Sequence, residues 1–403
     1  MFKQRLHFMV VMLLGLCAAP VAAQVSFERQ DYPAQNDASW VVTGDFNNDG
    51  IPDLLVVNSH SCVHSCLSST VSVLLGNGDG SFQLPISSDE GGYSAGMPAI
   101  GDFNSDGNLD VAVVGGGSSG ISILLGNGDG TFQPPRWIQT DQLLPVFLTA
   151  AALRSNGPTD LVGIENNSDG SFFSTRLFVI QGNGDGTFQS PVFSDLGSNG
   201  SSESGQSLTV ADLNGDGIPD IAVTVRPFCS PGCKGLVSVL LGNGDGTFQE
   251  PTRYGPLDYN TGGIVAADLM NRGIFDLAVT NAGRCPAGPD SCEGSVSVLI
   301  GNRDGSFQDP RNFRTKGCGL ITVGDFNGDG DVDVALTSCN PPLNNVLLLF
   351  GDGQGGFGNP ISFQVGSSPN GIAAGDFNQD GGPDLATSNM SSNVSVLINT
   401  TSH

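Results

Sequence analysis

One stretch decides the fold of this sequence: Gly44-Asp45-Phe46-Asn47-Asn48-Asp49-Gly50-Ile51-Pro52-Asp53. An apolar run follows it, and a second apolar run at residues 71–75 leads into the Gly-rich stretch Gly76-Asn77-Gly78-Asp79-Gly80-Ser81-Phe82. Both stretches recur along the chain. A unit that repeats at a nearly constant spacing is typical of propellers, solenoids and other repeat proteins.

The Asp-rich stretch occurs seven times, at intervals of 50 to 60 residues, and the Gly-rich stretch occurs six times. The leading positions of the Asp-rich stretches are Asp45, Asp102, Ala152, Asp212, Asp268, Asp325 and Asp376. The Gly-rich stretches end at Phe82, Phe132, Phe188, Phe248, Phe307 and Phe357. The seventh unit therefore lacks its last part.

The two ends of the sequence together supply the missing part. Residues 394–398 match the apolar run that precedes each Gly-rich stretch. Phe27 stands 18 residues before Asp45, as Phe307 stands 18 residues before Asp325. The N-terminal segment thus matches the final strand that the seventh unit lacks. Joining the first and last strands in one sheet closes a ring and removes exposed sheet edges.

Each unit has the pattern of four short strands: one before the Asp-rich stretch, one after it, and one on either side of the Gly-rich stretch. The sequence therefore predicts an all-β fold, a seven-bladed β-propeller of four-stranded blades, closed by the N-terminal strand joining the last blade. Two unrelated β domains are the alternative, but no linker or change in composition divides the chain. We expect residues 24–403 to form a single propeller domain.

The chain has 403 residues, 58 of them glycine, and a formal net charge of −25. Its apolar residues lie in short runs, which argues against a coiled coil or a helical bundle. Because binding to a phosphate backbone depends on Lys and Arg, the acidic balance argues against a nucleic-acid partner.

Residues 1–23 have the pattern of a signal peptide. Lys3 and Arg5 precede an apolar stretch, and Val21-Ala22-Ala23 fits a cleavage site. A lipoprotein would use Cys17, but the residue before that cysteine is not small. No later segment has the length of apolar sequence that spans a bilayer. We therefore expect an exported protein, extracellular or periplasmic, that does not insert into the membrane.

Eight cysteines follow residue 23, and they form four neighbouring pairs. An even number of cysteines in an oxidising compartment indicates disulfides. We predict the bonds Cys62–Cys66, Cys229–Cys233, Cys285–Cys292 and Cys318–Cys339. The last pair flanks an Asp-rich stretch symmetrically, as two residues facing each other across a hairpin would. His60-x-Cys62-x-His64-x-Cys66 also has the residue types that bind zinc or copper, and such a site is the alternative there.

Five of the seven Asp-rich stretches keep an oxygen-bearing side chain at positions one, three, five and nine. Calcium takes about six to eight oxygen ligands, and three carboxylates in one short loop repel one another unless a cation is present. We predict about five Ca²⁺ sites, with the carbonyl of position seven as a further ligand. Bare turns rich in Asp, Asn and Gly are the alternative. The predicted ligands are Asp45, Asn47, Asp49, Ile51, Asp53, Asp102, Asn104, Asp106, Asn108, Asp110, Asp212, Asn214, Asp216, Ile218, Asp220, Asp325, Asn327, Asp329, Asp331, Asp333, Asp376, Asn378, Asp380, Gly382 and Asp384.

The third and fifth stretches depart from this pattern. The third, residues 152–160, has lost two carboxylates and has Arg154 at its centre. The fifth, residues 268–276, has Met270 and Arg272 where ligands are expected. We predict no metal at either one, with a cationic side chain in the place of the ion.

The stretch at residues 44–53 and its partner Gly126-Asn127-Gly128-Asp129-Gly130-Thr131-Phe132 together resemble the FG-GAP/VCBS repeat family, whose fold is like the integrin α-subunit propeller. The resemblance covers essentially the whole mature chain. It implies Ca²⁺ in the loop between the first and second strands of each intact repeat, and ligand binding on the opposite face. Because the family includes adhesion modules, lectins and accessory domains of enzymes, it leaves the ligand open.

Strand alternation places the Asp-rich and Gly-rich stretches on one rim and the remaining loops on the other. The second rim varies most, at residues 59–70, 115–120, 165–175, 226–236, 282–295 and 340–345. Since varied loops on a rigid scaffold commonly carry function, we expect this rim to bind a glycan or a protein without catalysis; drift in unconstrained loops is the alternative.

Two other functions stay open. The first is a secreted polysaccharide lyase or hydrolase, which would use carboxylates near this rim; the second is a purely structural component of the envelope or matrix. The available carboxylates are Glu165, Glu203, Glu293, Asp195, Asp258 and Asp290, and no pair has a diagnostic spacing.

Overall fold

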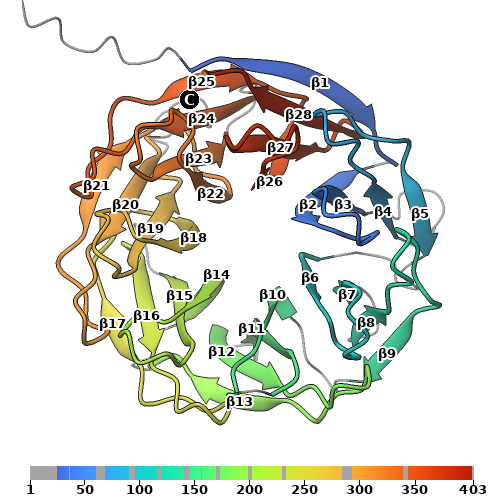
Figure 1. Cartoon of the computed structure of the whole chain (residues 1–403). Helices are drawn as coiled ribbons and strands as arrows, with labels where there is room; N and C mark the ends of the chain where they lie inside the picture. The colour runs from blue at the N-terminus through green and yellow to red at the C-terminus, as the bar shows by residue number, and fades with distance from the viewer. Residues whose placement is uncertain are drawn as a thin grey trace, which may run out of the picture.

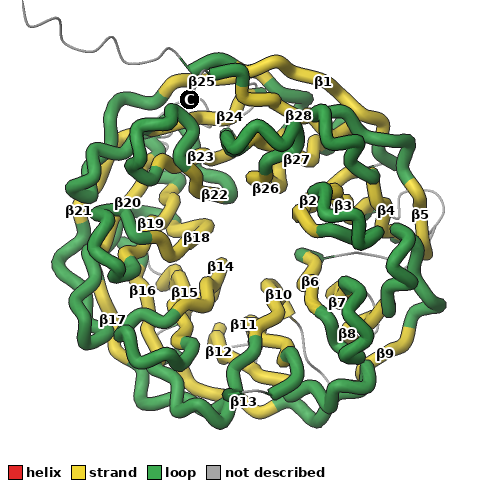
Figure 2. Tube along the Cα trace, viewed as in Figure 1, coloured by secondary structure: helices red, strands yellow, loops and turns green. Residues whose placement is uncertain are grey.

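The structure is a computed structural model that describes residues 25–35, 37–59, 69–89, 96–115, 120–139, 145–155, 157–168, 173–197, 202–228, 233–283, 293–338 and 344–401. These residues form 28 β-strands in seven four-stranded antiparallel sheets, and Figure 2 shows no helix among them. Accordingly, the described part holds no helix that is long and apolar enough to cross a membrane. The predicted signal peptide, residues 1–23, lies outside the described residues.

The sheets stand around a common axis as seven blades, in the order of the chain (Figure 1). From the axis outward, the first four blades are β2 (Ala38–Gly44), β3 (Asp53–Asn58), β4 (Thr70–Leu74), β5 (Ile86–Asp89); β6 (Pro98–Gly101), β7 (Asp110–Gly115), β8 (Gly120–Leu124), β9 (Arg136–Gln139); β10 (Pro145–Ala151), β11 (Asp160–Ser168), β12 (Phe173–Ile180), β13 (Val192–Asp195); and β14 (Glu203–Ala211), β15 (Asp220–Pro227), β16 (Leu236–Leu240), β17 (Thr252–Tyr254).

The remaining three are β18 (Thr261–Ala267), β19 (Asp276–Asn281), β20 (Ser295–Leu299), β21 (Arg311–Arg314); β22 (Ile321–Gly324), β23 (Asp333–Thr337), β24 (Asn345–Leu349), β25 (Ile361–Gln364); and β26 (Pro369–Gly375), β27 (Asp384–Asn389), β28 (Asn393–Asn399) with β1 (Phe27–Pro33) as the outermost strand. We number the blades 1 to 7 in this order. The predicted seven-bladed propeller is therefore confirmed.

The N-terminal strand closes the ring, as predicted. β1 pairs antiparallel with β28, from Phe27 opposite Asn399 to Pro33 opposite Asn393. Tyr32 of β1 packs edge-on against Phe82 of blade 1 with ring centroids 5.5 Å apart, as Tyr254 of blade 4 packs on Phe307 of blade 5 at 5.3 Å. β1 thus contacts the next blade in the way that an ordinary fourth strand does.

The hydrophobic core lies between adjacent blades. Every residue of β3 and β7 is buried, because their two faces pack against different neighbours, and this explains their nearly continuous apolar sequences. Between blades 1 and 2, for example, Val57 and Val73 pack with Val111 and Val113. Apolar side-chain packing therefore makes up most of the contact between sheets, while hydrogen bonds hold the strands within each sheet.

We call residues 45–53 and their six equivalents the Asp loops, and residues 76–82 and their five equivalents the Gly turns. Both connect strands of antiparallel sheets on one rim, as predicted. The variable loops connect strands on the other rim. The central parts of these loops, residues 60–68, 116–119, 169–172, 229–232, 284–292 and 339–343, lie outside the described residues.

Most of the predicted disulfides cannot be followed for the same reason. Cys233 and Cys318 are the two cysteines within the described residues, and both are disulfide-bonded. Their expected partners, Cys229 and Cys339, lie outside the described residues, so each pairing stays a prediction. Cys62–Cys66, Cys285–Cys292 and the alternative metal site at residues 60–66 also fall wholly outside the described residues.

Buried asparagines end the second strand of three blades. Each donates a hydrogen bond from Nδ2 to a serine Oγ of the third strand: Asn58 to Ser72 at 2.9 Å, Asn281 to Ser297 at 2.8 Å and Asn389 to Ser395 at 3.0 Å. In blade 7, Thr387 Oγ1 also donates to Asn389 Oδ1 at 3.2 Å. Valine takes the threonine position in blades 1 and 5, and Asn58 Oδ1 and Asn281 Oδ1 are buried with no hydrogen-bond partner.

This difference predicts the effect of Val279→Thr in blade 5. The new hydroxyl can donate to Asn281 Oδ1, so we expect the free energy of unfolding to stay within about 1 kcal/mol of the original protein. The matched control is Val223→Thr, because Val223 is equally buried but Val225 replaces the asparagine. Burying that unpartnered hydroxyl should cost about 1–3 kcal/mol. Chemical denaturation measures both, and an equal loss in the two variants would contradict the prediction.

Candidate functional site

Each Asp loop ends in a fully buried aspartate that joins two loops on the same rim. In blade 1, Asp53 Oδ2 accepts a hydrogen bond from the N–H of Phe46 in its own loop, and Oδ1 accepts one from the N–H of Gly76 in the Gly turn, both at 2.8 Å. Asp110, Asp220 and Asp333 repeat both bonds in blades 2, 4 and 6. In blade 7, Asn399 replaces the Gly turn and donates to Asp384 at 2.6 Å.

The other oxygen-bearing side chains of the loop lie above this aspartate and bind the loop backbone. Asp45 accepts hydrogen bonds from the N–H groups of Asp49 at 3.1 Å and Gly50 at 2.9 Å. Asn47 Nδ2 donates to Asp49 Oδ2 at 2.8 Å. The tight turn requires a left-handed backbone at Gly50, whose φ is 80°. All five intact loops bring the predicted ligands of positions one, three and five together in this way.

Burial makes the charged form of the ninth-position carboxylate unfavourable. It raises the pKa of Asp53, Asp110 and Asp384 to about 6 and that of Asp333 to about 7, above the ordinary value of 3.8. The pKa of Asp220 is raised for the same reason. In each loop the carboxylates of positions one or five add like-charge repulsion. The five intact loops therefore collect negative charge around a buried acid.

The two divergent loops place an arginine on the equivalent aspartate. In blade 3, Arg154 Nη2 lies 2.5 Å from Asp160 Oδ1 and donates to the Gly182 carbonyl at 2.9 Å. In blade 5, Arg272 Nη2 donates to Asp276 Oδ1 at 2.8 Å and to the Gly301 carbonyl at 3.3 Å. In both divergent loops the arginine therefore contacts the buried aspartate; that it takes the place of an ion stays a prediction.

These residues fit a hard divalent cation by their donor chemistry. Each intact loop carries at least three carboxylates and one amide oxygen, the ligand types that a hard divalent cation takes. Their side chains are hydrogen-bonded to the backbone, and among the described residues no three His, Cys, Asp or Glu side chains converge as a preformed metal cluster. The site is thus a loop with the right ligand types rather than a finished coordination shell.

The Asp loops also connect neighbouring blades, which the sequence did not predict. Phe46 of blade 1 packs edge-on against Phe132 of blade 2, with ring centroids 6.1 Å apart, and its carbonyl accepts the N–H of Gly130 at 3.0 Å. The equivalent ring pairs are Phe103–Phe188, Phe377–Phe82 and Phe326–Phe27. Leucine replaces the loop phenylalanine in blades 3, 4 and 5. The change from phenylalanine to leucine at this position was the sequence signal for these contacts between blades.

The rim carboxylates considered for catalysis are largely engaged in the fold. Arg176 pairs with the buried Glu165, and Arg253 pairs with the buried Glu203 at 2.6 Å. Glu293 pairs with Arg314 at 2.7 Å. Asp258 accepts the Ser295 hydroxyl at 2.9 Å and Asp195 accepts the Gly197 N–H at 2.9 Å, while Asp290 lies outside the described residues.

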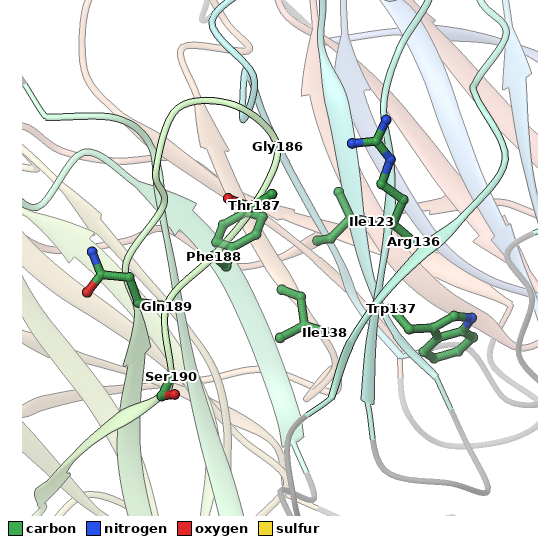
Figure 3. Close-up of a pocket in the computed structure, with 9 residues that line it drawn as sticks. All are labelled: Ile123, Arg136, Trp137, Ile138, Gly186, Thr187, Phe188, Gln189 and Ser190. Atoms are coloured by element: carbon green, nitrogen blue, oxygen red, sulfur yellow. The ribbon is translucent and has the colours of Figure 1, made fainter.

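A hollow of about 320 Å³ opens between blades 2 and 3, beside the third Gly turn. Figure 3 shows Ile138 and Phe188 facing each other across it, Arg136 and Gln189 at its sides, and the Trp137 ring on the other side of β9. No carboxylate lines this hollow, so it offers no acid–base pair.

A second hollow, of about 310 Å³, lies between blades 1 and 7. Asp45, Gly50 and Ile51 of the first Asp loop form one side of it, and Ala374 and Gly375 of β26 form the other. The first loop of the five thus faces an open space large enough for an ion and its water.

The profile of the FG-GAP-like repeat matches residues 45–113, 102–162, 153–223 and 325–387, more than half of the sequence. The chain belongs to the FG-GAP-like repeat family. No curated protein shows significant sequence similarity to this FG-GAP-like chain.

Solved structures share the architecture of this FG-GAP-like propeller at low sequence identity. The BP39L lectin from Burkholderia pseudomallei is 14% identical with a TM-score of 0.62, covering 91% of this chain and 98% of the lectin. The rhamnogalacturonan lyase YesW is 14% identical with a TM-score of 0.50, covering 94% and 76%. The Dos1 propeller is 9% identical with a TM-score of 0.53, covering 93% and 95%. At these identities the likeness shows the fold alone.

The raised pKa values predict how the stability of calcium-free protein depends on pH. Their contribution to stability is fully present below about pH 4, where the aspartates are protonated in both states, and is lost as the pH rises through about 6–7. We expect the thermal midpoint of protein freed of calcium by a chelator to fall over this window. Saturating calcium should flatten the dependence, since the ion favours the charged form. A midpoint that rises from pH 4.5 to 7.5 without calcium would contradict the prediction.

Proposed function

We propose that this protein is an exported, calcium-stabilised propeller that binds a glycan or a protein, without catalysis, through the rim of variable loops. The observation that carries the proposal is the difference between the two rims. One rim consists of repeated loops that bind each other, and the other consists of loops that differ in length and sequence. A rigid ring with one invariant and one varied rim suits a binding module.

The proposal of calcium binding is supported by the two loops that have an arginine beside the buried aspartate. Seven equivalent aspartates are fully buried, and Arg154 and Arg272 lie on two of them. The other five belong to loops that add at least two more carboxylates each, and no arginine or lysine among the described residues forms an ion pair with these five aspartates. A divalent cation is the simplest partner for that charge, since an uncompensated buried charge is strongly unfavourable.

Binding at the variable rim is supported by its exposed apolar residues. Phe228 borders the loop of residues 229–232 with 44% of its surface exposed, and the Arg226 guanidinium lies 5.7 Å from its ring centroid. Met390, between β27 and β28, is 53% exposed on the same rim. Aromatic and arginine side chains are enriched where proteins bind partners.

A lyase or hydrolase is less well supported. Such an enzyme needs carboxylates that can exchange protons with substrate, whereas Glu165 and Glu203 are buried in ion pairs with arginines. Export to the periplasm or the extracellular space is supported by the N-terminal pattern and is part of the same proposal.

Removing calcium should lower the thermal midpoint by about 5–10 °C in excess EGTA, because an ion that binds only the folded state stabilises it by mass action. Asp49→Ala should lower the midpoint in calcium and reduce the bound calcium by one equivalent. Asp79→Ala is the matched control, since Asp79 is an exposed carboxylate of the Gly turn. Calorimetry and elemental analysis measure both quantities. A thermal midpoint that EGTA leaves unchanged would contradict the proposed calcium binding.

Glycan arrays and pull-down experiments with calcium-loaded protein test the binding function. We expect Phe228→Ala to weaken any ligand found by about tenfold, the loss of roughly one aromatic contact, with an unchanged melting midpoint. Leu84→Ala is the control, because Leu84 is 78% exposed on the opposite rim. Turnover of a polysaccharide without stable binding would favour the enzyme instead.

A further inference from the structure

We propose that the ring consists of two unequal arcs. Blades 6, 7, 1 and 2 form an arc that calcium braces and that contains the junction of β1 with β28. Blades 3, 4 and 5 form an arc that is braced mainly by arginine and leucine. The inference rests on the proposed calcium binding and adds which parts of the molecule respond to the ion.

The first observation is the position of the two arginines. Arg272 binds both Asp276 and the carbonyl of Gly301, while the N–H of Gly301 binds the same aspartate at 2.8 Å. Arg154 makes the same set of contacts with Asp160 and Gly182 in blade 3. Each guanidinium therefore links an Asp loop to its Gly turn with a covalently attached positive charge. Removing calcium leaves these two links in place.

Blade 5 lacks one hydrogen bond that the five intact loops have. In the five intact loops, Oδ2 of the ninth-position aspartate accepts the N–H of position two. In blade 5 the N–H of Leu269 binds the Ala267 carbonyl instead, at 3.0 Å. Asp276 Oδ2 and Arg272 Nε are then both buried without a partner. The carboxylate has kept its place while the loop around it has changed.

The second observation is the contact between successive blades. From blade 6 through blade 2, each Asp loop presents a phenylalanine to the next blade, and its carbonyl accepts a hydrogen bond from that blade. The donors are Asn399 Nδ2 to Phe326 at 2.8 Å, Gly80 N to Phe377 at 3.0 Å, Gly130 N to Phe46 at 3.0 Å and Gly186 N to Phe103 at 2.9 Å. An ion that orders these loops also orders four consecutive interfaces between blades.

The remaining three interfaces are built differently. Leu153, Leu213 and Leu269 take the place of the phenylalanines and pack with Phe248, Phe307 and Phe357 respectively. Two of these leucines belong to the loops that carry an arginine. Blade 4 has an intact Asp loop but the leucine contact, so this arc holds one predicted ion against four in the other. The calcium-dependent contacts therefore concentrate around the junction of the two chain ends.

Hydrogen exchange of the full-length protein, with calcium and with excess EGTA, tests the difference between the arcs. We expect exchange in β1, β2, β27 and β28 to accelerate by about tenfold or more in EGTA, because local opening there loses the bound ion. Exchange in β11 and β19 should change by less than about twofold. Equal acceleration around the whole ring would overturn the inference.

A converted blade tests the role of the arginine directly. Met270→Asn combined with Arg272→Asp restores the oxygen pattern of the intact loops in blade 5, and we expect bound calcium to rise from about five to about six equivalents, one ion per intact loop. Hydrogen exchange in β19 should then become EGTA-sensitive. Arg272→Ala alone is the control: it should destabilise blade 5 equally with and without calcium and leave the stoichiometry unchanged. An unchanged stoichiometry in the folded double variant would overturn the inference.

These experiments distinguish a failure of the two-arc division from a failure of the proposed calcium binding. If the original protein binds no calcium, EGTA changes no exchange rate anywhere, and the proposed function fails first. If it binds calcium but β11 and β19 respond like β27 and β28, calcium binding stands and the division into arcs fails. If the double variant does not fold, the exchange pattern of the original protein and the Arg272→Ala control still decide the question.

Discussion

The structure depends on seven equivalent buried aspartates, one in each blade. Asp53 and its equivalents form the corner at which an Asp loop meets the hairpin that follows it, and each uses both oxygens or an arginine to hold that corner. Burying a carboxylate is unfavourable unless it accepts hydrogen bonds, and burying a backbone N–H group is unfavourable unless it donates one. The two needs satisfy each other. Every blade therefore has its first two strands joined by a loop that is anchored at the same buried position.

This constraint separates the two rims of the molecule. On one rim the loops must keep the spacing that brings the aspartate to its donors, so their sequences repeat. On the other rim the connections differ in length and sequence from blade to blade. The fold thus concentrates repetition where the blades are joined and places variation on the opposite face, which is the physical basis for proposing that the variable face binds a partner.

The repeats predicted the fold in detail. Their number gives the number of blades, the apolar runs in each repeat give the strands of a blade, and the incomplete seventh repeat indicates how the ring closes. The pairing of the segment that begins at Phe27 with the strand at residues 394–398 followed from the repeats, whereas the register, Phe27 opposite Asn399, came from the structure. Contacts between units could not be read in the same way. The sequence shows that Phe46 and Phe132 recur, but only the curvature of the ring decides that a loop phenylalanine meets the turn of the next blade. The oxygen pattern indicated ligand types, whereas the two hydrogen bonds of Asp53 depend on how the Asp loop and the Gly turn meet in space, which the spacing of residues does not show.

The pairing of β1 with β28 has a consequence for how the molecule is made. Residues 27–33 leave the ribosome before the other strands of the propeller, yet their neighbours in the sheet are residues 393–399, so this strand waits longest for a partner. Contacts between distant segments form slowly because loop closure opposes them. A lone strand is an aggregation hazard in the meantime, and Glu28, Arg29 and Asp31 give this one mixed charge along its length. Those charges suit a segment that must remain soluble by itself before the circle is complete.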